Sequence, residues 1–212
     1  MNLVESADLT VTVVSVPPMD NNVYILRERA SGRCLVIDCA NDASQILETI
    51  RAADGSLPLE RIVTTHRHPD HIQALAEVVE RTGAPAASGI DDARAIQDAT
   101  GIPQEALADG AEVRLGAIRL RVVQLVGHTP GSIALIVEPA GHPPVVFSGD
   151  SLFPGGVGKT TTPEDFASLI EDVERKIFAI LPDETLVLPG HGRATTLGAE
   201  RSKLPAWRER GW

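Results

Sequence analysis

Short apolar segments rich in β-branched residues alternate along the chain with turn residues and with longer stretches of helical periodicity. The pattern predicts extended strands at residues 10–16, 23–26, 34–38, 61–65, 118–126, 132–137, 145–147 and 185–188. Residues 17–22, with two prolines, an aspartate and two asparagines, are predicted to form the turn between the first two strands. Segments 132–137 and 145–147 are continuously apolar, so both faces of these strands should be covered.

Apolar residues at helical spacing predict helices at residues 43–53, 71–82, 91–99 and from 162 onward, and a helical tail from about 197 to 212. Thr162 has the chemistry of an N-cap, and Pro163 suits the first helical turn. The helix that follows carries one apolar stripe, formed by Phe166, Leu169, Ile170, Val173, Ile177 and Ile180. Pro205 predicts a break in the tail. Strands followed by helices occur twice without a linker, which predicts two mixed sheets packed together with helices outside.

Composition narrows the functional classes. The chain has 212 residues, a length typical of one domain, and its 19 lysines and arginines against 29 aspartates and glutamates give a net charge of −10. This acidic balance and an aromatic content of 3% disfavour nucleic-acid binding. Apolar stretches stay below the ~18 residues of a transmembrane helix, and the N-terminus does not resemble a signal peptide. We therefore expect a cytoplasmic protein with no membrane partner.

The two cysteines support the same location. Cys34 and Cys39 lie in one extended run, about five residues of roughly 3.3 Å each apart, which is beyond the reach of a disulfide. We expect both thiols to be reduced and to fill the core.

Three of the six histidines lie in one segment, Thr65-His66-Arg67-His68-Pro69-Asp70-His71, directly after a predicted strand. His66 and His68 are two residues apart on an extended segment, so their side chains can face the same way. Asp70 and His71 follow at the turn into the predicted helix and can face an adjacent point. Imidazole and carboxylate ligands suit zinc, iron or manganese, so this segment predicts a metal site.

Three further residues of metal-ligand type follow strands. His128 lies in Gly127-His128-Thr129-Pro130-Gly131, His191 in Pro189-Gly190-His191-Gly192, and Asp150 ends the strand Val146-Phe147-Ser148-Gly149-Asp150. Four strand ends therefore offer such side chains, which is where α/β scaffolds place their functional sites. His142 is different, because it lies in a Gly-His-Pro-Pro turn, and we expect it to be solvated.

Together these motifs resemble the metallo-β-lactamase-fold hydrolases, and among them glyoxalase II, the hydroxyacylglutathione hydrolases. The resemblance runs in family order from Asn22-Val23-Tyr24 and Val36-Ile37-Asp38, through the histidine segments, to Pro189-Gly190-His191-Gly192. It implies an α/β (α+β) fold, a four-layer αβ/βα sandwich of two mixed β-sheets flanked by helices, as a single domain over residues 1–212. Only residues 192–212 follow His191, so we expect no separate C-terminal helical glutathione-binding domain.

The resemblance implies a site for two divalent metal ions, zinc first, with iron or manganese as alternatives. His66, His68 and His128 would hold one ion, Asp70, His71 and His191 the other, and Asp150 would bridge both. Asp70 is also the residue to which we assign a catalytic role. Asp38 would orient the loops around the site without being a ligand. Lys159, in a glycine-rich loop after Asp150, matches the lysine that binds the carboxylate of the thiol cofactor; a solvated lysine is the open alternative.

The chemistry of such a site favours hydrolysis of a small-molecule thioester. A hydroxide bridging two metal ions is a nucleophile at neutral pH, and the residual positive charge can stabilise an oxyanion. A thiolate leaves without a general acid, because the pKa of a thiol is only about 8.5, whereas an amide nitrogen or an alkoxide needs a proton that these motifs do not obviously supply.

Other activities of the same fold stay open. They are a single-iron persulfide dioxygenase, a lactonase and a non-catalytic metal-binding scaffold. Phe153 argues against the lactonase, because the well-known lactonases carry tyrosine at that position. β-Lactamase activity is disfavoured by Asp150, since true β-lactamases of this fold generally lack a bridging aspartate. The acyl group, the thiol carrier and the oligomeric state are not determined by the sequence.

Overall fold

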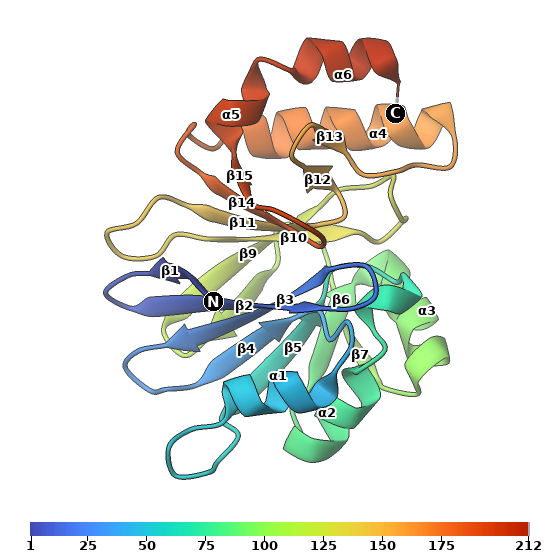
Figure 1. Cartoon of the computed structure of the whole chain (residues 1–212). Coiled ribbons are helices and arrows are strands. Elements are labelled where there is room, and N and C mark those ends of the chain that lie inside the picture. The colour runs from blue at the N-terminus through green and yellow to red at the C-terminus, as the bar shows by residue number, and fades with distance from the viewer. Residues whose placement is uncertain (212) are drawn as a thin grey trace.

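The computed structural model describes residues 1–211, and in it two β-sheets pack face to face with helices on both outer sides (Figure 1). The first sheet takes its strands in chain order: β1 (Asn2–Glu5), β2 (Leu9–Val16), β3 (Asn21–Glu28), β4 (Cys34–Ile37), β5 (Leu59–Thr64), β6 (Ala86–Gly89) and β7 (Gln104–Leu107). Its first three pairings are antiparallel, and the last three are parallel. The sheet is therefore mixed, as predicted.

The second sheet is also mixed and has the order β15-β14-β11-β10-β9-β8. Its strands are β8 (Glu112–Leu115), β9 (Ile118–Gln124), β10 (Ile133–Val137), β11 (Val145–Gly149), β14 (Leu186–Pro189) and β15 (Thr195–Thr196). Only the β11–β14 pair is parallel. A small hairpin of β12 (Leu152–Phe153) and β13 (Gly156–Val157) follows β11.

Helices cover the outer faces of both sheets. Those on the first sheet are α1 (Ala43–Ile50), α2 (Leu75–Thr82) and α3 (Ile90–Thr100). Those on the second are α4 (Pro163–Asp172), with its wider continuation η2 (Val173–Phe178), α5 (Leu197–Arg201) and α6 (Leu204–Arg210). The N-terminus of α4 has the predicted cap, since Thr162 Oγ1 accepts a hydrogen bond from Asp165 N.

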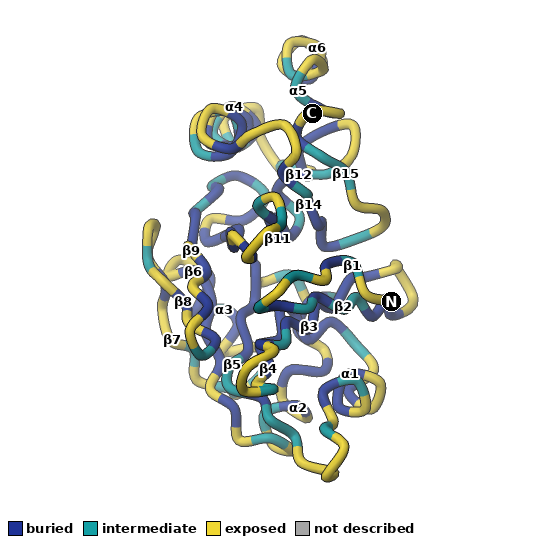
Figure 2. Tube along the Cα trace, turned by 90° about the vertical axis from the view of Figure 1, so that its left-hand side faces the viewer, coloured by how far each residue is buried: buried dark blue, intermediate teal, exposed yellow. Residues whose placement is uncertain are grey.

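Three apolar cores separate the four layers. One lies between the two sheets and includes Leu26, Leu35, Leu120, Leu135 and Phe147. A second lies between the first sheet and its helices, and a third between the second sheet and α4 to α6. In Figure 2 the buried residues follow the strands and the inner sides of the helices, while exposed residues lie on loops and outer helix faces. The four-layer sandwich predicted from the sequence is confirmed.

The helix predicted at 71–82 begins later than expected. A single 3₁₀ turn, η1 (Pro69–His71), comes first, and α2 starts at Leu75. The reason is that Gln73 N and Ala74 N donate to the carbonyl oxygens of Ala40 and Cys39, in the loop after β4, instead of closing helical turns. Asp70 and His71 are therefore held by the loop and not by a helix.

Other sequence predictions are corrected at the edges of elements. Strands β1, β6, β7, β8, β12, β13 and β15 were not predicted. Ile180 does not belong to the buried stripe and is 59% exposed, because the wider turns of η2 rotate the stripe and the helix ends at Phe178. The tail does break, between α5 and α6, just before Pro205. Trp207 is buried against Phe178, and Trp212 lies outside the described residues.

Cys34 and Cys39 are both buried, and both are free, as expected. Burial raises the pKa of the Cys34 thiol to about 11, which keeps it protonated and unreactive. Among residues 1–211, the structure holds no helix that is long and apolar enough to cross a membrane.

The two sheets are joined at one end by hydrogen bonds between the start of β3 and the end of β14. Asn22 N donates to Gly190 O over 2.7 Å, and the Tyr24 hydroxyl donates to Pro189 O over 2.6 Å. This end of the sandwich carries the histidines.

Candidate metal centre

The residues of metal-ligand type all follow strands, and the fold gathers them at one end of the sandwich. His66, His68, Asp70 and His71 follow β5 of the first sheet. His128 follows β9, Asp150 follows β11 and His191 follows β14, all in the second sheet. Each sheet therefore contributes part of one group of side chains, drawn from segments that are far apart in the sequence.

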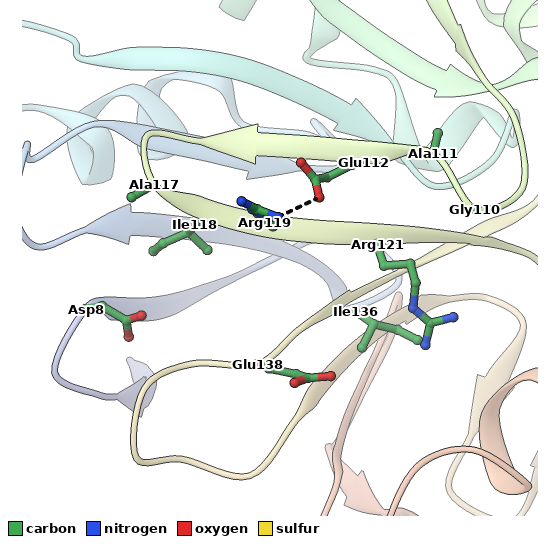
Figure 3. A pocket seen from close by; sticks show the side chains of 10 residues that line it. All are labelled: Asp8, Gly110, Ala111, Glu112, Ala117, Ile118, Arg119, Arg121, Ile136 and Glu138. Atoms are coloured by element: carbon green, nitrogen blue, oxygen red, sulfur yellow. Dashed lines mark ion pairs between the residues drawn. The ribbon is translucent and has the colours of Figure 1, made fainter.

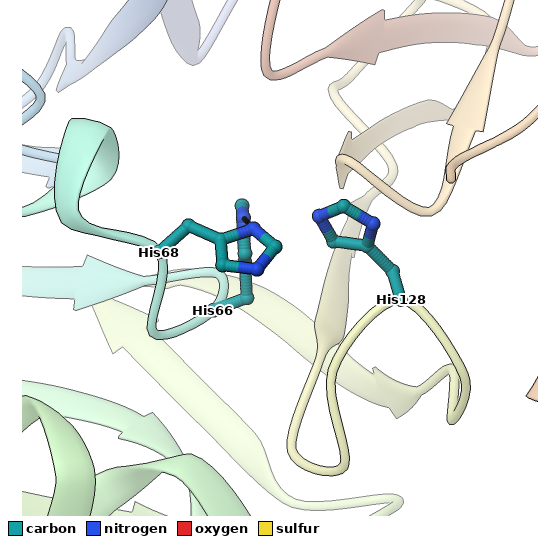
Figure 4. A group of neighbouring side chains, drawn as sticks. All are labelled: His66, His68 and His128. Carbon is teal, nitrogen blue, oxygen red and sulfur yellow. Dashed lines mark hydrogen bonds between the residues drawn. The ribbon is translucent and has the colours of Figure 1, made fainter. Parts of the chain in front are cut away.

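A first cluster consists of His66, His68 and His128, whose rings face one another (Figure 4). His66 Nε2 lies 3.1 Å from His68 Nδ1, and the ring centroids of His68 and His128 are 4.5 Å apart. One nitrogen of each ring lies within 4.8 Å of the others. Such spacing allows three imidazoles to bind one ion.

A second cluster consists of Asp70, His71 and His191. His71 Nε2 lies 3.1 Å from His191 Nε2, which in turn lies 3.2 Å from Asp70 Oδ2. His71 is fully buried, while Asp70 and His191 are partly exposed. The cluster is therefore open to solvent on one side.

Asp150 lies between the two clusters. Its Oδ2 is 3.3 Å from His191 Nε2 and 3.7 Å from His128 Nε2, and its Oδ1 is 3.5 Å from His71 Nε2. One carboxylate thus reaches members of both clusters.

The outer nitrogens of three histidines have fixed partners. His128 Nδ1 is 2.7 Å from Lys159 O, His191 Nδ1 is 2.9 Å from Met19 O, and His71 Nδ1 is 2.9 Å from Asp38 Oδ2. An oxygen of this kind only accepts, so each Nδ1 donates, and each Nε2, once it carries no proton, directs a lone pair at the cluster. Metal-binding histidines have the same arrangement.

The nitrogen and oxygen atoms that face into the clusters suit metal ions better than they suit one another as hydrogen-bond partners. His128 Nε2 and Asp150 Oδ1 are buried and have no hydrogen-bond partner among residues 1–211. A buried polar atom without a partner is costly, and a metal ion would remove that cost. Two glycines leave room around Asp150: a Cβ on Gly190 would lie 2.2 Å from its Oδ1, and one on Gly158 would lie 1.7 Å from its carbonyl oxygen.

The pKa shifts of His66 and Asp150 favour the binding of a cation. Burial, together with the neighbouring His71, lowers the pKa of His66 well below its usual range, so its ring stays neutral and can bind a cation. Burial would raise the pKa of Asp150, but the neighbouring histidines His191 and His71 hold it well below its usual range. The carboxylate therefore stays charged. Against the opposing effect of burial, Asp38 and Asp150 raise the pKa of His71 to about 10, so an ion binding at its Nε2 would displace a proton from that atom.

Comparison with known proteins decides the family. Residues 16–191 match the metallo-beta-lactamase superfamily, and this range contains both clusters and Asp150. The chain belongs to the metallo-beta-lactamase superfamily. The match shows the family and the fold together, and it agrees with the resemblance that the sequence motifs carry.

Relatives in the superfamily cover most of this chain. It is 32% identical over 205 residues to the Bacillus subtilis protein named "Probable metallo-hydrolase YqgX". The aligned region covers 90% of this chain and 93% of the relative. It is 35% identical over 187 residues to the hydroxyacylglutathione hydrolase of Fuscovulum blasticum, and the aligned region covers 86% of this chain and 67% of the relative. The crystal structure of TTHA1623 in a di-iron-bound form has a TM-score of 0.69 and 32% identity, and covers 90% of this chain and 97% of that one.

Two residues organise the second cluster without belonging to it. Asp38 accepts hydrogen bonds from Thr65 N over 2.7 Å and from the Thr65 hydroxyl over 2.8 Å, besides its contact with His71. It thus lies where the sequence analysis expects an orienting residue. Asn21 Nδ2 donates to Asp70 Oδ2 over 2.8 Å. Asn21 begins β3, so its assignment to a turn was wrong, and its role was not foreseen.

Lys159 and His142 lie outside the clusters. The Lys159 residue is exposed and helps to line a pocket of about 550 Å³ with Phe153, Val157, Thr160 and Arg210, among others. The His142 ring contacts the carbonyl of its neighbour Pro143, in a turn, and joins neither cluster.

A separate surface groove of about 450 Å³ lies along β8 and β9 (Figure 3). It contains side chains of both signs, including the pair Glu112 and Arg119 at 3.9 Å. No residue of the two clusters lines it. The groove therefore lies apart from the candidate metal centre.

Proposed function

We propose that the protein is a binuclear metallo-hydrolase that cleaves small acyl thioesters, as glyoxalase II does. The observation that carries this proposal is the position of Asp150, whose two oxygens lie within 3.3–3.7 Å of histidines from both clusters. His66, His68 and His128 would hold one ion, Asp70, His71 and His191 the other, and Asp150 would bridge them. The named relatives support a hydrolase, and one of them is a hydroxyacylglutathione hydrolase.

We propose zinc as the metal, with iron or manganese as alternatives. Imidazole and carboxylate ligands suit all three metals, and one solved relative is described as di-iron-bound. Two divalent ions in such a site supply a nucleophile from water at neutral pH and polarise the carbonyl of the substrate.

The protein's own residues fix the orientation of the cluster histidines and keep Asp70 charged. The bonds from His71, His128 and His191 to Asp38, Lys159 O and Met19 O fix the ring positions before any substrate enters. Burial would raise the pKa of Asp70, but the hydrogen bond from Asn21 and the nearby His71 lower it, so Asp70 is an ionised carboxylate. We assign it the catalytic role of accepting the proton released from the attacking water, at the carboxylate oxygen that does not receive the Asn21 hydrogen bond.

The first prediction tests the thioester assignment. A 2-hydroxyacyl thioester is expected to be cleaved with a kcat/KM at least about tenfold higher than that of the matched oxygen ester, because a thiolate leaves unaided and an alkoxide needs a proton. The measurement is kcat/KM for both members of the pair with the zinc-loaded protein. A lactone or β-lactam that is hydrolysed faster than every thioester would contradict the assignment, and a persulfide consumed with oxygen uptake would favour a dioxygenase.

The second prediction concerns Lys159, which we propose binds an acidic group on the thiol carrier. Replacing Lys159 by alanine leaves its carbonyl, and so the bond to His128, in place. KM for an anionic thiol carrier is expected to rise by about 3- to 10-fold with kcat little changed, the pattern of lost uniform binding. The effect should weaken with added salt.

Two controls separate charge from packing at this position. Lys159→Arg keeps the charge and is expected to keep KM within about twofold. A neutral thiol carrier should show little difference between the wild type and Lys159→Ala. An unchanged KM for the anionic carrier in Lys159→Ala would remove Lys159 from the binding site.

A further inference from the structure

Asp92 is a buried carboxylate that none of the chemistry above uses. It lies in the first turn of α3 and is fully buried. Its Oδ2 accepts hydrogen bonds from Arg67 N over 3.0 Å and from the Thr129 hydroxyl over 2.5 Å, and its Oδ1 accepts one from Gly131 N over 3.2 Å. A buried carboxylate with so many donors needs a reason to be there.

The donors belong to the two loops that carry the first cluster. Arg67 lies between His66 and His68, so one hydrogen bond fixes the peptide between two members of the cluster. Thr129 follows His128, so a second hydrogen bond fixes the loop of the third member. All three imidazoles of the first cluster therefore depend on one side chain for the relative position of their backbones.

The packing around Asp92 leaves these loops little freedom. A Cβ on Gly131 would lie 2.2 Å from Asp92 N, and one on Gly89 would lie 2.0 Å from Gly131 O. The start of α3 and the His128 loop are thus in direct backbone contact, which only glycine at both positions allows. Ser132 completes the arrangement, because its Oγ lies 2.7 Å from the Thr129 hydroxyl.

The second cluster is organised by other residues. Asp38 holds His71, and Asn21 holds Asp70. Asp38 also touches the first cluster, through Thr65, whose N–H and hydroxyl donate to it and whose hydroxyl lies 3.0 Å from His66 Nδ1, whereas the loops of His68 and His128 are held by Asp92. Each cluster thus has its own buried carboxylate, Asp92 for the first and Asp38 for the second.

We infer that Asp92 is a positioning residue that sets the affinity of the first metal ion separately from that of the second. This inference rests on the two-ion assignment in the proposed function. Asparagine at position 92 keeps the shape but has only one accepting oxygen, so its amide group would face a donor from Arg67, Thr129 or Gly131. The loops would then separate slightly, and the three imidazoles would no longer converge as well on one point.

The test compares Asp92→Asn with Asp91→Asn by titrating metal-stripped protein with zinc against a chelating indicator. Asp91 is the exposed neighbour in the same helical turn, and its carboxylate accepts a hydrogen bond from Gln124 instead of from a donor of either ligand loop. Asp92→Asn is expected to weaken one of the two zinc affinities by about 10- to 100-fold and to leave the other within about twofold. Asp91→Asn should match the wild type in both.

Zinc occupancy from anomalous diffraction identifies which site is affected. Loss at His66, His68 and His128, with full occupancy at Asp70, His71 and His191, is the expected result. A role confined to fold stability would instead lower both affinities together, along with the melting temperature of the stripped protein. That outcome, or wild-type affinity at both sites, would overturn the inference.

Thr129→Val is a milder variant for the case that Asp92→Asn does not fold. It removes one donor and should weaken the same affinity by a smaller factor. Where Asp92→Asn does fold, the double variant should lose less than the product of the two factors, because both changes break the same hydrogen bond. A Thr129→Val protein that folds and binds both zinc ions as the wild type does would count against the inference. If the wild type binds a single zinc ion, the binuclear proposal fails on its own, and the effect of Asp92→Asn on that one affinity still tests the inference.

Discussion

Replacing Asp150 by asparagine is expected to reduce the bound metal and to lower hydrolysis by more than about 100-fold, the upper range for changes next to metal ligands. The side chain lies between both clusters, so its charge would be lost to both ions at once. The amide would also place a donor beside the Nε2 atoms of the histidines. The measurements are metal content after dialysis and kcat/KM for the best thioester.

Asp98→Asn is the matched control for this variant. Asp98 is an exposed carboxylate on α3 that pairs with Arg94, so its loss should leave both readouts unchanged. Two metal ions per chain and a nearly native rate in Asp150→Asn would rule out a bridging role.

Three histidine-to-alanine variants are expected to fall into two groups. His128→Ala and His191→Ala should each lower the rate by orders of magnitude, because each removes a ring nitrogen directed at a cluster and leaves a backbone carbonyl, Lys159 O or Met19 O, without its donor. His142→Ala should keep nearly full activity, since its ring contacts only the turn in which it lies. Rates and metal content are measured for all three.

The outcome also tests the assignment of ions to clusters. His128→Ala should lose metal from the first cluster and His191→Ala from the second, with the melting temperature of the stripped proteins little changed. Equal effects of all three substitutions would show that proximity to the clusters does not decide function.

The layers of the fold were predictable because the relevant signals are local. The alternation of apolar and polar residues in β9 and the continuous apolar runs in β10 and β11 indicate directly which strand faces are covered. Strands β6 and β7 escaped prediction because their residues, Ala-Ala-Ser-Gly and Gln-Glu-Ala-Leu, have weak strand preference. Strand β6 forms because β5 supplies a parallel partner from more than 20 residues away, and β7 pairs in parallel with β6 in turn.

The residues of the two clusters and Asp150 were predictable for a different reason. Each directly follows a recognisable strand, and their order along the chain matches a known family. Asn21 was not predictable, because an asparagine after two prolines is typical of a turn, and its partner Asp70 lies 49 residues away. Asp92 was not predictable either: acidic residues are common in the first turn of a helix, and nothing local distinguishes it from the exposed Asp91.

The division of the clusters between the two sheets has a consequence for the stability of the protein. The first sheet provides His66, His68, Asp70 and His71, and the second provides His128, Asp150 and His191, so parting the sheets at this end takes the donor atoms away from one another. Any ion that binds only the closed arrangement opposes that parting, by about 2.7 kcal/mol at a free concentration 100 times its dissociation constant. The supply of metal in the surroundings would then govern how long each molecule survives heat and proteases. A shortage of metal would lower the amount of folded protein as well as its activity.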